Sequence, residues 1–478
     1  MITKIMLCCC MIFIGCSNAT KKNNPNDLLS KKMDDFLTGL VANNNFSGSV
    51  LVMKDGQEIL KKGYGYADRE TKTPYTPQTI STVGSVTKQF TGTAILKLEM
   101  MGKLSVNDSL EKYFADAPAD KKKITLHQLL THTAGLKPEI GDDYEPLTRD
   151  AFIKRAMETP LNAAPGQRYE YSNVGFSILA AIVEITGGMN YEQFLQKYLF
   201  EPAGMKNTGY VVPDWKQHTL ATGYRGKERW GKFNEKPWAA DGPYWNMKGN
   251  GGILSNVEDM YRWHEALLTD NILNAAAKEK LYGRHVKEGP DADSYYGYGW
   301  AIMPTPRKTW LVTHNGGNGI FFCDVLRFLD EKVTIIFQTN AAQRGQNDIA
   351  FLLARMVFNP DFVPAVKPAV AGKEFKTLPE SPQGKLLQEL TSLMIKGEDG
   401  PMIKFINENF ATRFIAAVPL EVRLPRLKKI GSLIKDAAIE KVIYDGEKTD
   451  IYFKTSTGML IFGAIVQAGK IDGIMVQD

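Results

Sequence analysis

The sequence has little cysteine and little histidine, with five of the first and six of the second in 478 residues. Four of the cysteines fall within residues 1–16, so beyond that stretch Cys323 has no partner for an internal disulfide. Its apolar surroundings predict a buried, inert thiol rather than a nucleophile. His127 and His132 are five positions apart with no third ligand close by. We therefore expect neither a metal site nor another cofactor.

A strong charge of one sign is also missing. The formal net charge is +5, and the longest basic run, residues 121–123, is a lysine triplet. Such a run is typical of a solvated turn, so the charge pattern does not predict nucleic acid as a partner. With 44% hydrophobic and 23% charged residues, the chain has the composition of a globular protein, and its length predicts two or three domains.

Residues 1–16 differ from the rest of the chain. Lys4 precedes an apolar stretch, residues 5–15, which is too short to span a bilayer but has the length of a signal-peptide core. It leads into Cys16 and then a polar segment, an arrangement that resembles a bacterial lipoprotein signal and implies a lipid on Cys16. We therefore expect an exported, lipid-anchored protein of the cell envelope, in the periplasm or at the outer membrane, with residues 17–27 as a tether. A plain secretory signal with a chance cysteine is the alternative.

The order of helical and β-rich segments predicts the fold class. β-rich runs open and close the next region while helical runs fill its middle, so we expect an α+β domain over residues 28–358 whose two ends share a sheet. The turn Asp55-Gly56 between the first two β-rich runs is a strong hairpin signal. The predicted strands are residues 49–54, 58–64, 296–303, 310–313, 320–328 and 333–338. The clearest predicted helices are residues 29–40, 86–101, 124–135 and 175–186.

The C-terminal part is predicted to be a separate domain. Five of the 23 prolines fall in residues 359–384, which is typical of a linker. Residues 385–478 then show a helical stretch followed by three β-rich segments, which predicts a small helix-plus-antiparallel-sheet domain. The three segments are residues 439–444, 451–454 and 460–466. This domain carries no recognisable chemistry, and we expect it to serve in docking or stabilisation.

The stretch around Ser85 is the first candidate for chemistry. Apolar residues recur at three- to five-residue steps over residues 86–101, which predicts an amphipathic helix with one buried face, ending near Gly102. Ser85 and Lys88 would lie on the same side of this helix, near its positive end. An adjacent basic group can convert a serine hydroxyl into a nucleophile. Because the Ser-x-x-Lys spacing occurs twice more in the chain, it is weak by itself.

Two further motifs accompany Ser85. Tyr171-Ser172-Asn173 follows the turn Pro165-Gly166, and His314-Asn315-Gly316-Gly317 ends a β-rich run. Each has a simple structural explanation, because a tyrosine can cap a loop and histidine with glycines can form a turn. The three motifs in this order are much more informative than any one of them.

With these motifs the chain resembles the serine β-lactamase and penicillin-binding-protein superfamily, in particular its class C-like branch. That branch includes AmpC-type lactamases, D-Ala-D-Ala carboxypeptidases, D-amino-acid amidases and esterases. The resemblance covers about residues 30–355 and implies an antiparallel sheet flanked by helices, with a helical subdomain. It rests on the Ser85–Lys88 motif, LLTHTAGL (129–136), PGQRYEYSNVGF (165–176), FEPAGMKNTGY (200–210), GNGGILSNVEDM (249–260), YGYGW (296–300) and HNGG (314–317).

The resemblance implies a role for each residue of the motifs. Ser85 would attack a carbonyl carbon and form an acyl-enzyme. Lys88 would accept or share its proton, and Tyr171, as a phenolate-like partner, would relay that proton to the leaving group. Which of the two is the base stays open. Asn173 would orient Lys88 and bind the substrate amide.

The strand carrying the HNGG motif would bind the substrate. Gly316 would belong to the substrate-binding residues, and the backbone N–H groups of Ser85 and Gly317 would form the oxyanion hole. β-Lactamases and most penicillin-binding proteins have lysine where this chain has His314, and esterases and amidases often have histidine. An ordinary histidine is mostly neutral at pH 7, so we expect weak recognition of anionic β-lactams and a preference for esters, D-peptides or small amides.

We therefore expect a serine hydrolase that acts on a small-molecule or peptidoglycan-derived amide or ester, whether a β-lactam, a D-amino-acid peptide or a small ester. The alternative is a catalytically inactive envelope protein that uses the same fold as a binding module. The complete set Ser85, Lys88, Tyr171 and Asn173 counts against that alternative.

Overall fold

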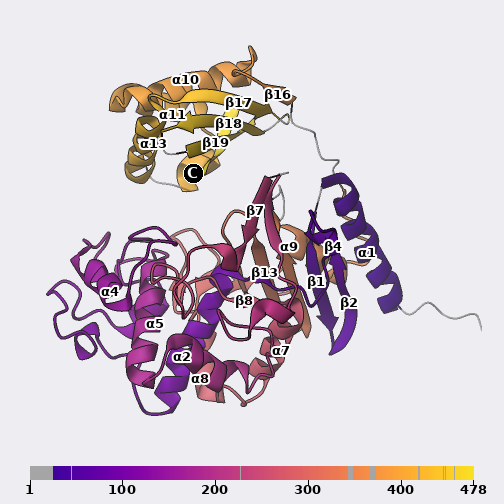
Figure 1. The fold of residues 1–478 in the computed structure, drawn as a ribbon, viewed down its shortest axis with the longest axis vertical. Helices are drawn as coiled ribbons and strands as arrows, with labels where there is room; N and C mark the ends of the chain where they lie inside the picture. The colour runs from indigo at the N-terminus through magenta and orange to yellow at the C-terminus, as the bar shows by residue number, and fades with distance from the viewer. Residues whose placement is uncertain are drawn as a thin grey trace, which may run out of the picture. The chain divides into compact units, whose positions relative to one another are not determined.

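The computed structural model describes residues 25–44, 46–226, 228–342, 348–366, 373–417, 420–444, 446, 448–456 and 458–477. The expected signal, Cys16 and most of the expected tether lie outside these residues. The chain divides into two compact units, one ending at residue 367 and the other beginning at residue 368 (Figure 1).

The first unit is built on an eight-stranded antiparallel sheet with the order β2-β1-β14-β13-β12-β11-β10-β9. The N-terminal strand β1 pairs with β14 from Gly48 opposite Thr339 to Lys54 opposite Val333. The two ends of the domain therefore share one sheet, which confirms the predicted α+β class. The strands are β1 (Gly48–Lys54), β2 (Gln57–Tyr64), β9 (Val286–Lys287), β10 (Tyr295–Tyr296), β11 (Ala301–Pro304), β12 (Trp310–Gly317), β13 (Phe322–Phe328) and β14 (Val333–Thr339).

The turn between β1 and β2 explains why this hairpin was predictable. Asp55 and Gly56 both have positive φ angles, 51° and 73°. A two-residue turn of this kind matches the twist of the strands that it joins, and aspartate and glycine tolerate it best.

Helices cover both faces of the sheet (Figure 1). On one face, α1 (Pro25–Asn44) and α9 (Ile349–Phe358) pack against β1, β13 and β14 in one apolar cluster. On the other face, a larger cluster joins the sheet to the remaining helices of the unit. These are α2 (Thr87–Met100), α3 (Leu126–Leu130), α4 (Arg149–Glu158), α5 (Asn173–Gly187), α6 (Tyr191–Leu195), α7 (Val257–Leu268) and α8 (Ala275–Leu281).

Two predicted helices differ from the structure. The α2 helix forms where predicted, but every residue from Thr87 to Leu96 is buried, so the prediction of a single buried face was wrong. The predicted helix over residues 124–135 is only the five-residue α3. It begins at a capping box formed by Thr125 and Gln128, and the chain leaves the helix through His132, whose φ angle is +57°.

The described residues of the second unit form a five-stranded antiparallel sheet with four helices. The three predicted strands form its centre, and the sequence-based prediction missed both edge strands. One of them, β16, lies inside the segment expected to be a linker and pairs with β17. The strands are β16 (Lys373–Phe375), β17 (Ala438–Tyr444), β18 (Lys448–Thr455), β19 (Gly458–Gln467) and β20 (Lys470–Gln477). The helices are α10 (Pro382–Lys396), α11 (Asp399–Asn409), α12 (Thr412–Ala417) and α13 (Leu420–Ile434).

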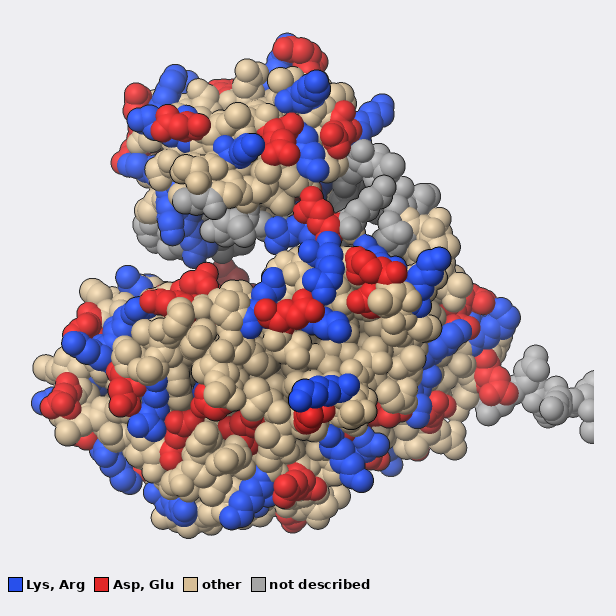
Figure 2. All heavy atoms as spheres, in the orientation of Figure 1, with Lys and Arg blue, Asp and Glu red and all other residues tan. Residues whose placement is uncertain are grey.

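The surface charges and the helix compositions bear on whether a macromolecule or a membrane is a partner. On the face of the first unit seen in Figure 2, Lys and Arg side chains are interspersed with Asp and Glu. No single helix in the described part of the chain has both the length and the apolar composition needed to cross a bilayer. One bent pair, α5 with residues 191–200, passes that test together, and α5 is packed in the domain core.

Candidate active site

Ser85 lies at the junction between the sheet and α2. It occupies the middle of a 3₁₀ turn, Gly84–Val86, that leads directly into the helix. Ser85 is partly exposed, whereas Lys88 in the first turn of α2 is fully buried. The Lys88 Nζ atom lies 3.2 Å from Ser85 Oγ. The two residues therefore share one small volume, as the three-residue spacing predicted.

The buried amine of Lys88 is surrounded by oxygen atoms. It lies 2.8 Å from Asn173 Oδ1 and 2.8 Å from the backbone carbonyl oxygen of Asn250. Burial holds the pKa of Lys88 well below the ordinary lysine value, although Asp143 and Glu139 act in the opposite direction. A lowered pKa increases the fraction of neutral amine, which is the form that can accept a proton.

Tyr171 completes the group around Ser85. Its side chain is hydrogen-bonded to that of Ser85, and the ring centre lies 4.8 Å from Lys88 Nζ. Burial raises the pKa of Tyr171 above that of an ordinary phenol, and the hydrogen bond to Ser85 offsets only part of this effect. The raised pKa favours the protonated phenol over a phenolate, and the role of Tyr171 in the reaction stays a prediction.

The start of α5 holds Tyr171 and Asn173 in place. Ser172 caps the helix, because its hydroxyl oxygen accepts the backbone N–H of Gly175 at 3.2 Å. The same hydroxyl donates to the carbonyl oxygen of Lys137 at 2.7 Å. The backbone N–H of Asn173 donates to Pro138 O at 2.9 Å. The loop that follows α3 therefore fixes the Tyr171–Asn173 segment.

Two glycines at the end of β12 allow the sheet to approach the Ser85 turn. A Cβ atom at Gly316 would lie 2.3 Å from the backbone nitrogen of Ser85 and 2.2 Å from Val83 O. A Cβ atom at Gly84 would lie 2.5 Å from the backbone nitrogen of Gly317. No real side chain tolerates such distances. The absence of side chains at Gly84 and Gly316 brings the backbone nitrogens of Ser85 and Gly317 to the same edge of the site.

His314 is buried, and both of its ring nitrogens have hydrogen-bond partners. Its Nε2 atom lies 2.9 Å from the hydroxyl of Tyr296, and its Nδ1 atom lies 2.6 Å from Asn315 O. Burial, together with the nearby amine of Lys88, lowers the pKa of His314 to about 3. The ring is therefore neutral, and neither nitrogen is open to a ligand in this arrangement. In this structure the side chain contacts Tyr296, and the expected substrate contact from His314 stays a prediction.

The part played by Asn250 could not be inferred from the sequence. Its carbonyl oxygen binds Lys88, and its side-chain amide donates to Ser177 Oγ and to Asn246 O, both at 2.8 Å. The Tyr210 hydroxyl further ties this loop, because it accepts the N–H of Gly249 and donates to Gly251 O. The block GNGGILSNVEDM was recognised, but a backbone carbonyl has no side-chain signature from which to infer a role.

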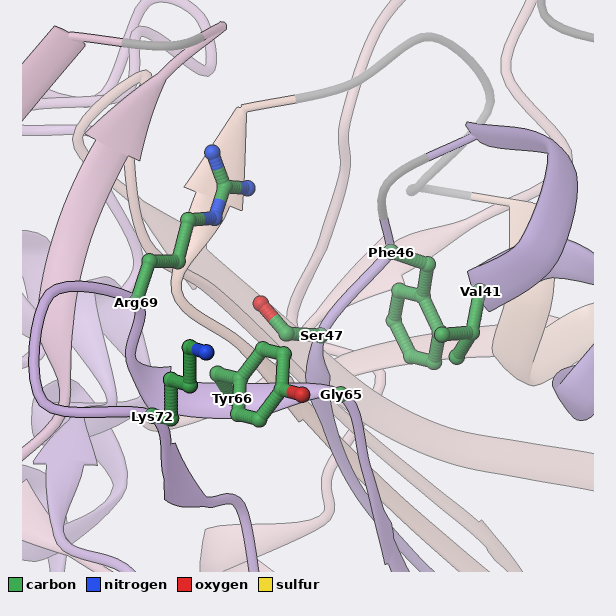
Figure 3. Close-up of a pocket in the computed structure, with 7 residues that line it drawn as sticks. All are labelled: Val41, Phe46, Ser47, Gly65, Tyr66, Arg69 and Lys72. Carbon is green, nitrogen blue, oxygen red and sulfur yellow. The ribbon is translucent and has the colours of Figure 1, made fainter.

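Other features of the described residues lie apart from this site. No group of three or more His, Cys, Asp or Glu side chains in the described ranges is placed to hold a metal ion. A cavity of about 470 Å³ lies between the end of α1 and strand β3 (Tyr66–Asp68), and it shares no residue with the Ser85 group (Figure 3). Its lining residues are Val41, Phe46, Ser47, Gly65, Tyr66, Arg69 and Lys72.

An antiparallel sheet whose edge meets a serine and a lysine at the start of a buried helix defines a class of serine hydrolase. The comparisons with known proteins identify the family. The family model described as Beta-lactamase matches residues 33–354, and the chain belongs to that family.

Among curated relatives, the chain is 26% identical over 359 residues to penicillin-binding protein 4* of Bacillus subtilis (strain 168), which is 68% of this chain and 74% of that protein. It is 28% identical over 395 residues to the D-aminopeptidase of Brucella anthropi, covering 78% of this chain and 71% of the relative.

A solved structure, the octameric penicillin-binding protein homologue of Pyrococcus abyssi, resembles this fold with a TM-score of 0.61 at 22% identity. The likeness covers 92% of this chain and 94% of that chain. Because the first unit ends at residue 367 of 478, this share also takes in residues of the second unit.

Proposed function

We propose that this member of the beta-lactamase family is a hydrolase that cleaves an amide or ester bond through an acyl-enzyme at Ser85. The observation that carries the proposal is the placement of a buried amine and a phenol around one partly exposed hydroxyl. In this reaction Ser85 Oγ attacks the carbonyl carbon, the bond to the leaving amine or alcohol breaks, and water then releases the acid. The backbone N–H groups of Ser85 and Gly317 hold the negative oxygen that forms in each step.

The hydrogen-bond count around Lys88 favours it as the base. A neutral amine has two N–H donors and one lone pair, and two of its three neighbours are carbonyl oxygens, which only accept. If both N–H groups point at Asn173 Oδ1 and Asn250 O, the lone pair faces the Ser85 hydroxyl. Lys88 then accepts the serine proton. Tyr171 starts as a protonated phenol, donates its proton to the leaving group and receives a proton from Lys88 in exchange.

Covalent labelling tests the function directly. We expect each molecule of the full-length protein to bind one fluorophosphonate group covalently, on the peptide that contains Ser85. An activated serine reacts with this reagent, whereas an ordinary serine does not. Intact mass spectrometry followed by peptide mapping makes the measurement. Ser85→Ala should remain unlabelled under the same conditions. Labelling elsewhere, or equal labelling of the variant, would contradict the proposal and favour a non-catalytic binding module.

The substrate class that we propose is a small ester, a D-amino-acid peptide or a small amide, in preference to an anionic β-lactam. The buried, neutral ring of His314 offers no charge to a substrate carboxylate. A lost charge-assisted hydrogen bond costs about 1.5–3 kcal/mol, or about 10- to 100-fold in kcat/KM. The D-aminopeptidase among the curated relatives is compatible with this class.

We accordingly expect p-nitrophenyl acetate to be hydrolysed with a kcat/KM at least about 10-fold above that of nitrocefin, relative to their uncatalysed rates. Because the pKa of His314 is lowered to about 3, the ring carries no charge near neutral pH, and lowering the pH from about 8 to 6 should not improve nitrocefin turnover through it. Parallel steady-state assays at several pH values provide the test. Efficient nitrocefin hydrolysis that is unchanged between these pH values would refute this preference.

We also propose that the protein is exported and anchored through a lipid on Cys16. Expression of the full chain in a bacterium should yield a membrane-associated protein whose mature N-terminal peptide begins at Cys16 and carries the mass of acyl chains. Cys16→Ser should lose that mass and move to the soluble fraction with its esterase activity intact. The matched control is Cys10→Ser, which should stay in the membrane fraction. Recovery of unmodified Cys16 in a soluble wild-type protein would contradict the anchor.

A further inference from the structure

His132 accepts two hydrogen bonds, one from each of the two residues that flank Tyr171. Its backbone carbonyl oxygen accepts the N–H of Glu170 at 2.8 Å, and its ring Nδ1 accepts the N–H of Ser172 at 3.0 Å. The residues immediately before and after Tyr171 are therefore both tied to the same residue. The imidazole also lies against the phenol, with 4.3 Å between the ring centres.

This arrangement has two energetic costs. His132 adopts a φ angle of +57°, in the left-handed region that most side chains avoid. Its Nε2 atom is buried and has no hydrogen-bond partner among the described residues. A buried polar group without a partner destabilises the folded protein. Backbone strain in the left-handed region destabilises it further, and strain of this kind clusters at functional sites.

The ring must also be neutral, because Nδ1 can accept the Ser172 N–H only without a proton of its own. Burial holds the pKa of His132 well below its usual range, and the amine of Lys88 and the ring of His314 act in the same direction. Phe176 and Tyr296 enclose the other sides of the ring, with centres 5.0 Å and 4.7 Å away. An apolar side chain would fill this space without an unsatisfied nitrogen.

We propose that His132 is a positioning residue, which holds the Tyr171 hydroxyl at Ser85 by accepting the Ser172 N–H and by packing against the phenol. This inference rests on the proposed function. A displacement of about 1 Å in a reacting group can cost on the order of 10²-fold in rate. The two hydrogen bonds on either side of Tyr171 limit such displacements, because they fix the backbone from which its side chain extends.

Three substitutions at His132 test separately the effect of its hydrogen-bond acceptor and the effect of its strained backbone. His132→Asn keeps an acceptor oxygen at the δ position, and asparagine tolerates the left-handed conformation. His132→Leu removes the acceptor but keeps apolar bulk, and His132→Gly removes the acceptor and relieves the strain. His127→Leu is the matched control, because this half-buried histidine five residues earlier bonds Tyr298 rather than the Tyr171 segment. Each full-length variant is checked for folding by its thermal midpoint.

The readouts are the rate constant for fluorophosphonate labelling per folded molecule, and kcat and KM for p-nitrophenyl acetate. We expect His132→Leu and His132→Gly to lower the labelling rate and kcat by about 10²-fold with KM changed less than about threefold. For His132→Asn, the labelling rate and kcat should lie within about 10-fold of the wild-type values. For His127→Leu, both should equal the wild-type values. If His132→Asn is as slow as His132→Leu, or if His132→Leu reacts as fast as the wild type, the inference is wrong. A wild type that does not label at all would instead overturn the proposed function, and this inference with it.

Discussion

Replacing Lys88 with methionine is expected to lower kcat/KM for ester hydrolysis by about 10³- to 10⁴-fold, because Ser85 loses the only amine within hydrogen-bonding distance among the described residues. Methionine has nearly the same length and fills the buried space, so the effect reports the lost base rather than a cavity. The residual rate should come from the backbone N–H groups of the oxyanion hole. Steady-state kinetics with p-nitrophenyl acetate gives the measurement.

The role of Lys88 as the base also predicts the direction in which kcat/KM changes with pH. Only neutral Lys88 accepts a proton, so kcat/KM of the wild type should rise with pH as Lys88 loses its proton. Because burial lowers the pKa of Lys88, the plateau should begin well below pH 10.5, the ordinary lysine value. The residual activity of Lys88→Met should lack this rise.

The matched control for Lys88→Met is Lys121→Met, which changes another buried lysine that pairs with Asp120. It should keep kcat/KM within about threefold of the wild type. If Lys88→Met retained more than about a tenth of the activity, another group would have to be the base.

The parts of the fold that could be predicted were those that short stretches of sequence encode. The turn Asp55-Gly56 specifies its hairpin through the two positive φ angles that it needs, and the three-residue spacing of Ser85 and Lys88 places both on one side of a helix. The second unit shows the opposite case. Its central strands β17, β18 and β19 were predicted, whereas β16 and β20 at the two edges were missed, because an edge strand is defined by the partner that it joins as much as by its own residues.

The candidate site was predictable to a similar degree. The side chains of Ser85, Lys88, Tyr171 and Asn173 were found by motif, and the structure brings them together. What the sequence could not indicate was the raised pKa of Tyr171 and the hydrogen bonds to both ring nitrogens of His314, because both depend on packing by residues that are distant in the chain. The contribution of Asn250 was hidden for a different reason, since a backbone carbonyl is common to every residue.

Replacing Gly316 with alanine is expected to lower kcat/KM by about 10²- to 10³-fold, the loss typical of removing one oxyanion-hole donor. The new Cβ would lie 2.2 Å from Val83 O and 2.3 Å from Ser85 N, and both are backbone atoms that cannot rotate away. Either the Ser85 turn or the end of β12 must therefore move, and the N–H groups of Ser85 and Gly317 would no longer meet at one point. Because both donors act mainly on the transition state, kcat should fall much more than KM rises.

The control for this substitution is Gly400→Ala in α11, where a Cβ meets no atom within 4 Å and the φ angle is not in the left-handed region. It should leave kcat and KM unchanged, and it should change the free energy of unfolding of the second unit by no more than about 1 kcal/mol, because Gly400 lies in the first turn of α11, directly before Pro401, and not in the helix interior. Thermal denaturation of Gly316→Ala separates loss of fold from loss of geometry. If the variant is folded and its kcat stays within about threefold of the wild type, the oxyanion is held elsewhere, and the proposed part of Gly317 in the reaction is wrong.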